Sequence, residues 1–169
     1  MPEATNLNFF LGILLIIEIE WDSVAQHQAH LGTDLEKQIT GIIWPLIDTS
    51  RSIVTSHIPF DPSVPSKCFE APIVEICIHS NVQKIPGFEE RIVAFEETAR
   101  KEKTYRGMLS GWKLEEGNEK DFFAVVGWSS LDDHVKVINE SPLVEEVEKI
   151  RELSGDAESH HVVLTQWVA

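Results

Sequence analysis

The chain has 169 residues, 43% of them apolar, which is enough for one domain or two small ones with a real core. Its 28 acidic residues against 14 basic ones give a net charge of −14, which argues against binding to a nucleic-acid backbone or to an anionic membrane surface. The two cysteines, Cys68 and Cys77, fit neither a metal-binding spacing nor a disulfide framework, and this indicates a reducing compartment.

The N-terminal part of the chain predicts a strand, a helical segment and a second strand. The apolar run within residues 9–21 is too short to span a membrane and follows no basic segment, so we interpret it as a core strand of a soluble, cytoplasmic protein. Apolar residues at helical spacing then predict a helical segment from residue 24 to about 47, broken near Gly32 and again at Pro45. A strand is expected over residues 51–58.

A proline-rich stretch divides the chain. Residues 59–72 contain four prolines, which predicts a stiff, extended connector. The chain therefore separates into an N-terminal segment, 1–58, and a C-terminal domain, 73–169.

The C-terminal domain predicts one complete α+β unit. Its strand and helix patterns follow the order βαββαβ, which is the ferredoxin-like arrangement. Right-handed crossovers then place both helices on one face of a four-stranded antiparallel sheet, with the first and last strands side by side. The expected elements are a strand over 73–79, a helix over 87–103, strands over 106–114 and 121–128, a helical segment over 131–153 that restarts at Ser141, and a strand over 160–168.

One short pattern occurs twice. A strand ends at a tryptophan, a serine two residues later is placed to cap a helix, and a histidine follows on the first helical turn. The matched residues share one offset: Trp21 with Trp128, Ser23 with Ser130, and His27 with His134. This indicates an internal duplication, of which residues 1–58 contain only the strand–helix–strand half. Such a partial repeat is either completed by another molecule or shortened from a two-repeat protein.

These residues resemble the dimeric α/β-barrel superfamily, and within it the antibiotic-biosynthesis-monooxygenase-like proteins common in fungi. The strand ending at Trp128 with His134 in the next helix, and the pair Trp21 and His27, carry the resemblance. It implies a small-molecule enzyme of secondary metabolism that oxygenates or cyclises an aromatic, polyketide-like substrate by acid/base chemistry, without a cofactor. It also implies a homodimer with a ligand cavity inside the barrel or under the helices.

Strand alternation sorts the candidate catalytic residues. Along 73–79 one face is purely apolar, and we expect it to meet the helices, so that Glu75 and His79 point the other way. His79 is the first candidate for a general base near neutral pH, the alternative being a surface histidine at a strand end. Tyr105 could donate a hydrogen bond to an enolate oxygen. His134 could be a second acid/base group, although its counterpart His27 favours packing on the preceding tryptophan.

An aromatic wall would suit a flat substrate, with core or interface packing as the alternative for each ring. The substrate-binding candidates are Glu75, Trp112, Trp128, Phe122 and Gln166. We also expect the rings of Trp112, Phe122 and Trp128 to lie on an exposed sheet face that a second copy of the chain covers.

The sequence favours neither a metal nor a nucleotide cofactor. His160 and His161 are adjacent, so on a regular strand they point to opposite faces and cannot hold one ion. The chain has no glycine-rich nucleotide motif. The alternative to the enzyme is a non-catalytic ligand-binding or assembly protein, which the incomplete first repeat favours.

Overall fold

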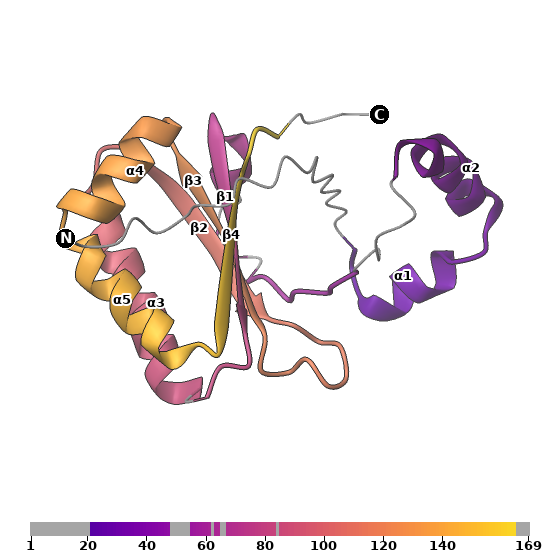
Figure 1. Ribbon diagram of the computed structural model, residues 1–169. Coiled ribbons are helices and arrows are strands. Elements are labelled where there is room, and N and C mark those ends of the chain that lie inside the picture. The colour runs from indigo at the N-terminus through magenta and orange to yellow at the C-terminus, as the bar shows by residue number, and fades with distance from the viewer. Residues whose placement is uncertain (1–20, 48–54, 62, 65–66, 84, 165–169) are drawn as a thin grey trace, which may run out of the picture. The chain divides into compact units, whose positions relative to one another are not determined.

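The computed structural model describes residues 21–47, 55–61, 63–64, 67–83 and 85–164, and the chain divides into two compact units, 1–54 and 55–169 (Figure 1). The boundary lies between Val54 and Thr55 rather than after Ile58. None of the described helices is long and apolar enough to span a bilayer.

The first unit contains two short helices. They are α1 (Val24–His30) and α2 (Asp34–Ile43), followed by a 3-10 turn, Trp44–Leu46. The hydroxyl of Ser23 accepts a hydrogen bond from the Gln26 amide, and this caps α1 as the sequence predicts. The predicted breaks near Gly32 and at Pro45 are confirmed. The expected strand over 9–21 lies almost entirely outside the described residues, as do residues 51–54, and residues 55–58 are not in a strand.

The second unit has the predicted ferredoxin-like α+β fold. Its four strands are antiparallel, in the order β2-β3-β1-β4. Figure 1 shows all three helices of this unit on one face of the sheet. The elements are β1 (Ile73–Ser80), α3 (Ile85–Ala99), β2 (Tyr105–Trp112), β3 (Phe122–Trp128), α4 (Leu131–Glu140), α5 (Leu143–Leu153) and β4 (Asp156–Val162).

The largest difference from the predicted element boundaries is in the last strand, and the predicted break between the last two helices is confirmed. The last strand begins at Asp156 and ends at Val162, where 160–168 was expected. The strand starts early because Gly155 donates to the Ser80 carbonyl and so aligns the chain beside β1 immediately after α5. The predicted restart of the helical segment at Ser141 is confirmed, since its hydroxyl accepts from the Leu143 amide at the start of α5.

The sheet presents the opposite face to the helices from the one expected. Trp128 and Phe122 are 0% and 4% exposed, and they lie in the core beneath the helices, with Cys77 packed against the same cluster. The register pairs Glu75 with Val126 and Cys77 with Ala124, so the helix-facing side of β1 carries Glu75, Cys77 and His79. The expectation of an exposed Trp112, Phe122 and Trp128 face is therefore wrong.

The other sheet face is covered in part by the proline-rich segment. A 3-10 turn, η2 (Lys67–Glu70), packs against β2 and β3, and Cys68 and Ala71 are buried there. A Cβ on Gly127 would come within 2.8 Å of the Ala71 Cβ, so glycine lets this turn sit directly on β3. Residues 67–71 are thus a packed part of the second unit, whereas an extended connector was expected over 59–72. Both sheet faces are covered, so an apolar strand face does not identify the helix side.

Candidate functional site

Glu75 is the centre of a polar cluster on the helix side of the sheet. Its Oε1 accepts a hydrogen bond from the Ser159 hydroxyl at 2.6 Å, and its Oε2 accepts one from the Trp128 indole N–H at 3.1 Å. The Nε2 atom of His134 lies 3.1 Å from the same Oε2. Three elements, β3, α4 and β4, therefore supply the partners of one carboxylate on β1.

His134 reaches this carboxylate because α4 begins directly above it. Ser130 caps the helix by accepting from the Asp133 amide, which fixes the first turn that carries His134. The imidazole is 1% exposed and lies against the Trp128 ring, with centroids 4.8 Å apart. Its second nitrogen, Nδ1, lies 2.8 Å from Nε2 of His161.

The partners of Glu75 keep it charged in a buried place. Burial alone would raise its pKa, but His134, Ser159 and Trp128 together outweigh this and lower the pKa to about 2. Glu75 is therefore a carboxylate at neutral pH. Burial and the charge of His134 lower the pKa of His161, although the Glu75 carboxylate acts in the opposite sense.

Glu75, His134 and His161 offer ligand atoms that all lie within 4.8 Å of one another, which is the spacing of a possible metal site. Glu75 contacts one nitrogen of His134 and His161 contacts the other. Both nitrogens of His134 thus already face protein partners, and an ion would have to replace one of these contacts. Among the described residues the three side chains form a compact cluster of direct contacts.

A cavity of about 100 Å³ lies between the sheet and the helices, with Glu75 in its wall. Its polar side comes from β1, β4 and the end of α5, including His79, Ser159 and Arg151, and α3 contributes apolar residues such as Phe95. Small-molecule sites usually have volumes of roughly 300–1,000 Å³. The cavity therefore has room for a few waters or a very small organic molecule, and a polycyclic guest would require the helices to move.

His79 lines the same cavity as a neutral base. Burial, helped by the charge of Arg151, lowers its pKa to about 4, so it is uncharged at neutral pH. Its Nδ1 lies 2.9 Å from the Ser154 hydroxyl, and that hydroxyl donates to the Ile150 carbonyl at 3.0 Å. Ser154 can then only accept from Nδ1–H, which leaves a lone pair on Nε2 of His79.

No family model and no curated protein sequence matches the chain, but solved structures do. SnoaB, a cofactor-independent oxygenase from Streptomyces nogalater, is 10% identical, and the match covers 57% of this chain and 95% of that chain with a TM-score of 0.50. A protein proposed to be a monooxygenase from Lactobacillus acidophilus is 12% identical, covering 83% of this chain and 65% of that chain with a TM-score of 0.54. One of the same description from Fusobacterium nucleatum is 11% identical, covering 82% and 64% with a TM-score of 0.54.

The chain has the ferredoxin-like α+β fold of these proteins. Sequence identities of 10–12% establish the fold and leave the reaction open. Within this ferredoxin-like unit, the structure brings together four of the sequence-predicted site residues, Glu75, His79, His134 and Trp128, although only the first two line the cavity.

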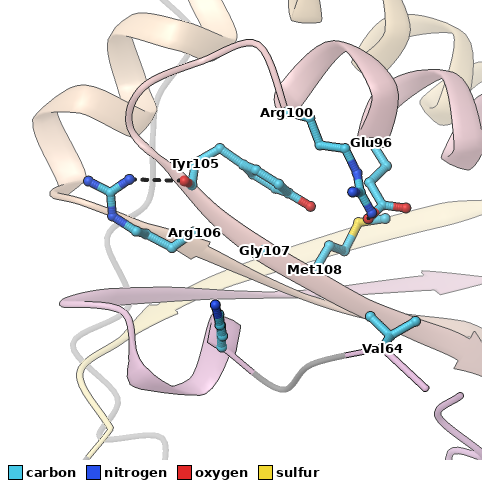
Figure 2. A pocket seen from close by; sticks show the side chains of 8 residues that line it. Val64, Glu96, Arg100, Tyr105, Arg106, Gly107 and Met108 are labelled. Atoms are coloured by element: carbon cyan, nitrogen blue, oxygen red, sulfur yellow. Dashed lines mark hydrogen bonds and ion pairs between the residues drawn. The ribbon is translucent and has the colours of Figure 1, made fainter. Parts of the chain in front are cut away.

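Tyr105 lies in a different pocket. That pocket, of about 150 Å³, is formed by α3, β2 and the segment before η2, and Figure 2 shows the Tyr105 ring pointing toward Glu96 and Arg100. The edge of the ring also packs against Trp128, with centroids 5.9 Å apart. The register sets Tyr105 opposite Trp128 and His79 opposite Phe122, so the two candidates lie at opposite ends of β3 and do not act together.

The remaining candidates divide between core packing and residues outside the described range. Trp112 and Phe122 pack on each other and on Phe88, and the Trp112 indole donates to Glu89 at 2.8 Å. Neither ring lines the cavity. Gln166 lies outside the described residues, so its assignment stays a prediction.

Sequence reasoning missed His161 and Ser159 as partners of Glu75. The pairing of β1 with β4 sets Glu75 opposite His161 and Cys77 opposite Ser159, so these side chains share a face. A strand expected to begin at residue 160 excluded Ser159. The available signal was the histidine pair itself, because in this fold the last strand runs beside the first.

Proposed function

We propose that the second unit is a cofactor-independent enzyme that uses acid/base chemistry on a small organic substrate in the cavity under the helices. The observation that carries this is a charged, buried Glu75 and a neutral His79 in one cavity wall. Two titratable groups that line one cavity and whose pKa values are shifted by their surroundings are typical of acid/base sites. The fold is also that of SnoaB, which is a cofactor-independent oxygenase.

In this proposal His79 is the general base. Its Nε2 lone pair accepts a proton from an electron-rich phenol or an activated carbon acid, and the negative charge of Glu75 favours the imidazolium that forms. The resulting enolate reacts with dioxygen or with a carbonyl group of the same substrate. His134 holds the Glu75 carboxylate in place and keeps it charged.

The volume of the cavity limits the size of the proposed substrate. A cavity of about 150 Å³ accommodates benzene, and the cavity beside Glu75 has about 100 Å³. A substrate with at most one small ring therefore fits best, and an aromatic polyketide would enter only after α3 and α5 separate from the sheet. A cytoplasmic place in secondary metabolism belongs to the same proposal.

Oxygen uptake by the purified full chain tests the enzyme. A panel of hydroquinones and polycyclic phenols is incubated in an oxygen electrode with a chelator present, and products are followed by mass spectrometry. We expect turnover without added metal or flavin, and a loss of about 10²–10⁴-fold in His79→Gln. Full turnover in His79→Gln would remove the mechanism, whereas His160→Gln, outside the cavity wall, should behave as the parent.

The small cavity also favours a second function, a binding or assembly protein without chemistry. In that case no panel member is converted, and a single-ring phenol binds with the same affinity to the parent chain and to His79→Gln, as measured by calorimetry.

The homodimer stays a prediction, but the observation that supports it is no longer the one used in the sequence analysis. The exposed aromatic face that suggested it is buried in the core. What supports it now is the resemblance of the chain to the dimeric α/β-barrel superfamily. Light scattering during size exclusion should give twice the chain mass at micromolar concentration, and a monomer would contradict the prediction.

A further inference from the structure

The contacts of Glu75 continue past His134 to the surface of the molecule. Glu75 lines the cavity, His134 is 1% exposed, and His161 on the edge strand β4 is exposed. We propose that His161 and His134 form a proton relay between solvent at β4 and the Glu75 carboxylate at the cavity wall.

The first contact on this path is a hydrogen bond, and the second is an ion-pair contact at 3.1 Å that lacks the angle of a hydrogen bond. His161 Nε2 lies 2.8 Å from His134 Nδ1, and His134 Nε2 lies 3.1 Å from Glu75 Oε2. The two imidazole rings are 4.6 Å apart between centroids and tilted by 45°. The buried histidine thus has a proton-binding partner at each of its nitrogens, one leading outward and one leading to the cavity.

The transfer balances without any further reactant. A proton from water binds Nδ1 of His161 while the proton on Nε2 passes to Nδ1 of His134. The proton on Nε2 of His134 then passes to Oε2 of Glu75. One proton enters, one arrives, both rings exchange tautomers, and transfer in the opposite direction restores them.

Other charged groups surround the path on every element packed against it. Arg151 of α5 and Glu158 of β4 line the cavity with Glu75, and His79 lies on the same face of β1. His160 affects the charge of His161, and Asp133 on α4 accepts from the Ser130 hydroxyl. None of these groups lies between two consecutive members of the relay, whose contacts are direct.

Packing alone does not account for this arrangement. Stacking on a tryptophan places the ring of His134, as it places His27 on Trp21 in the first unit, with centroids 4.8 Å apart in both pairs. A ring held only for packing has no need of a carboxylate at one nitrogen and an imidazole at the other. The register that sets Glu75 opposite His161 supplies both.

Hydrogen exchange at the imidazole tests the relay in the full chain. The protein is labelled with ¹⁵N-histidine, and the rate at which solvent deuterium replaces the His134 Nε2 proton is measured by NMR near pH 7. In His161→Gln, which keeps a hydrogen-bonding side chain but cannot relay a proton, we expect exchange to slow at least about tenfold, because only local opening then reaches this site. The matched control His160→Gln should exchange at the parent rate.

An unchanged rate in a folded His161→Gln, or equal slowing in His160→Gln, would overturn the relay. If His161→Gln does not fold, as judged by circular dichroism, the parent chain still decides. The His134 Nε2 proton should then exchange faster than the backbone amides of β3 and α4, which exchange only through local opening. An Nε2 proton that exchanges as slowly as these amides would contradict the relay.

The use of the relay in turnover rests on the proposed function, but the exchange measurement does not. A chain that converts no substrate and shows slowed exchange in His161→Gln keeps the relay and loses the enzyme. A chain whose turnover depends on His79 and whose His161→Gln variant exchanges like the parent keeps the enzyme and loses the relay.

Discussion

Glu75 and His79 lie on one face of β1, and burial disfavours the charged form of both side chains. Their partners decide the different outcomes. Glu75 has an imidazole, an indole N–H and a hydroxyl around it and stays charged, whereas the nearby Arg151 adds to the effect of burial on His79. At the residue scale, one strand face therefore holds a fixed negative charge beside a neutral base.

The lowered pKa of His79 predicts an acid-sensitive fold. Its pKa falls from 6.5 in the unfolded chain to about 4 in the folded chain. Between pH 6.5 and 4 the unfolded chain therefore binds one more proton than the folded chain does. The contribution of His79 to the free energy of unfolding is fully present above about pH 6.5. The free energy of unfolding then declines by about 3 kcal/mol as the pH falls to about 4. Urea unfolding at pH 7, 5.5 and 4 should show this decline in the parent and a smaller one in His79→Gln. Equal slopes in both proteins would contradict it.

The indole N–H of Trp128 predicts a second residue-scale effect. Trp128→Phe keeps an aromatic ring but removes one donor to Glu75, which should cost about 1.5–3 kcal/mol at neutral pH because the acceptor is charged. Trp112→Phe is the matched control, since its indole donates to Glu89 at an exposed position and should cost clearly less.

The acid limb of the same unfolding measurement separates charge from packing. Glu75 contributes stability above about pH 4.5, and this is lost as the pH falls toward its folded pKa of about 2. Trp128→Phe raises the folded pKa of Glu75. The free energy of unfolding of this variant should therefore increase less than that of the parent as the pH rises from about 2 to about 4.5. A variant with an unchanged acid limb would show that the indole contributes only packing.

At the element scale, much of the fold could be predicted from the sequence. Strand composition, the Ser130 cap and the break at Ser141 located β3, α4 and α5, because these signals are local. The face of β1 could not be predicted, because Val74 and Ile76 are buried on the side opposite the helices. The candidate site was predicted only in part. Glu75 and His79 could be identified from their positions on one strand, but the contact with His161 depends on the strand register, which no local signal fixes.

The close approach of η2 to β3 predicts the effect of a single methyl group. A Cβ at Gly127 would lie 2.8 Å from the Ala71 Cβ and 2.9 Å from the Cys68 Cα. Because the nearest atoms belong to backbone and to a short side chain, Gly127→Ala should destabilise by about 1–3 kcal/mol. Gly87→Ala within α3 has open space and should be neutral or stabilising by up to about 1 kcal/mol. In thermal unfolding, the midpoint temperature of Gly127→Ala should therefore lie clearly below that of Gly87→Ala.

At the scale of the whole molecule, the hydrophobic core belongs to the second unit. The buried cluster runs from Val82 to Ile150, and its polar neighbours Glu75 and His134 come from the same part of the chain. Fold and candidate site are therefore contained in residues 55–169.

This containment predicts that residues 55–169 fold alone. Expressed by itself, the unit should unfold in one cooperative transition within a few degrees of the corresponding transition of the full chain, as followed by circular dichroism, because the core cluster is complete within it. A fragment without a cooperative transition would show that the first 54 residues help to hold the sheet together.

The tilted contact between Trp128 and His134, 4.8 Å between ring centroids, has an optical consequence. A positively charged imidazole against an indole quenches the excited state of that indole, and a neutral one does so far less. The chain has five tryptophans, and subtracting the emission of Trp128→Phe would isolate this one. The intrinsic fluorescence of Trp128 therefore reports, without any label, whether the buried imidazole of His134 is charged.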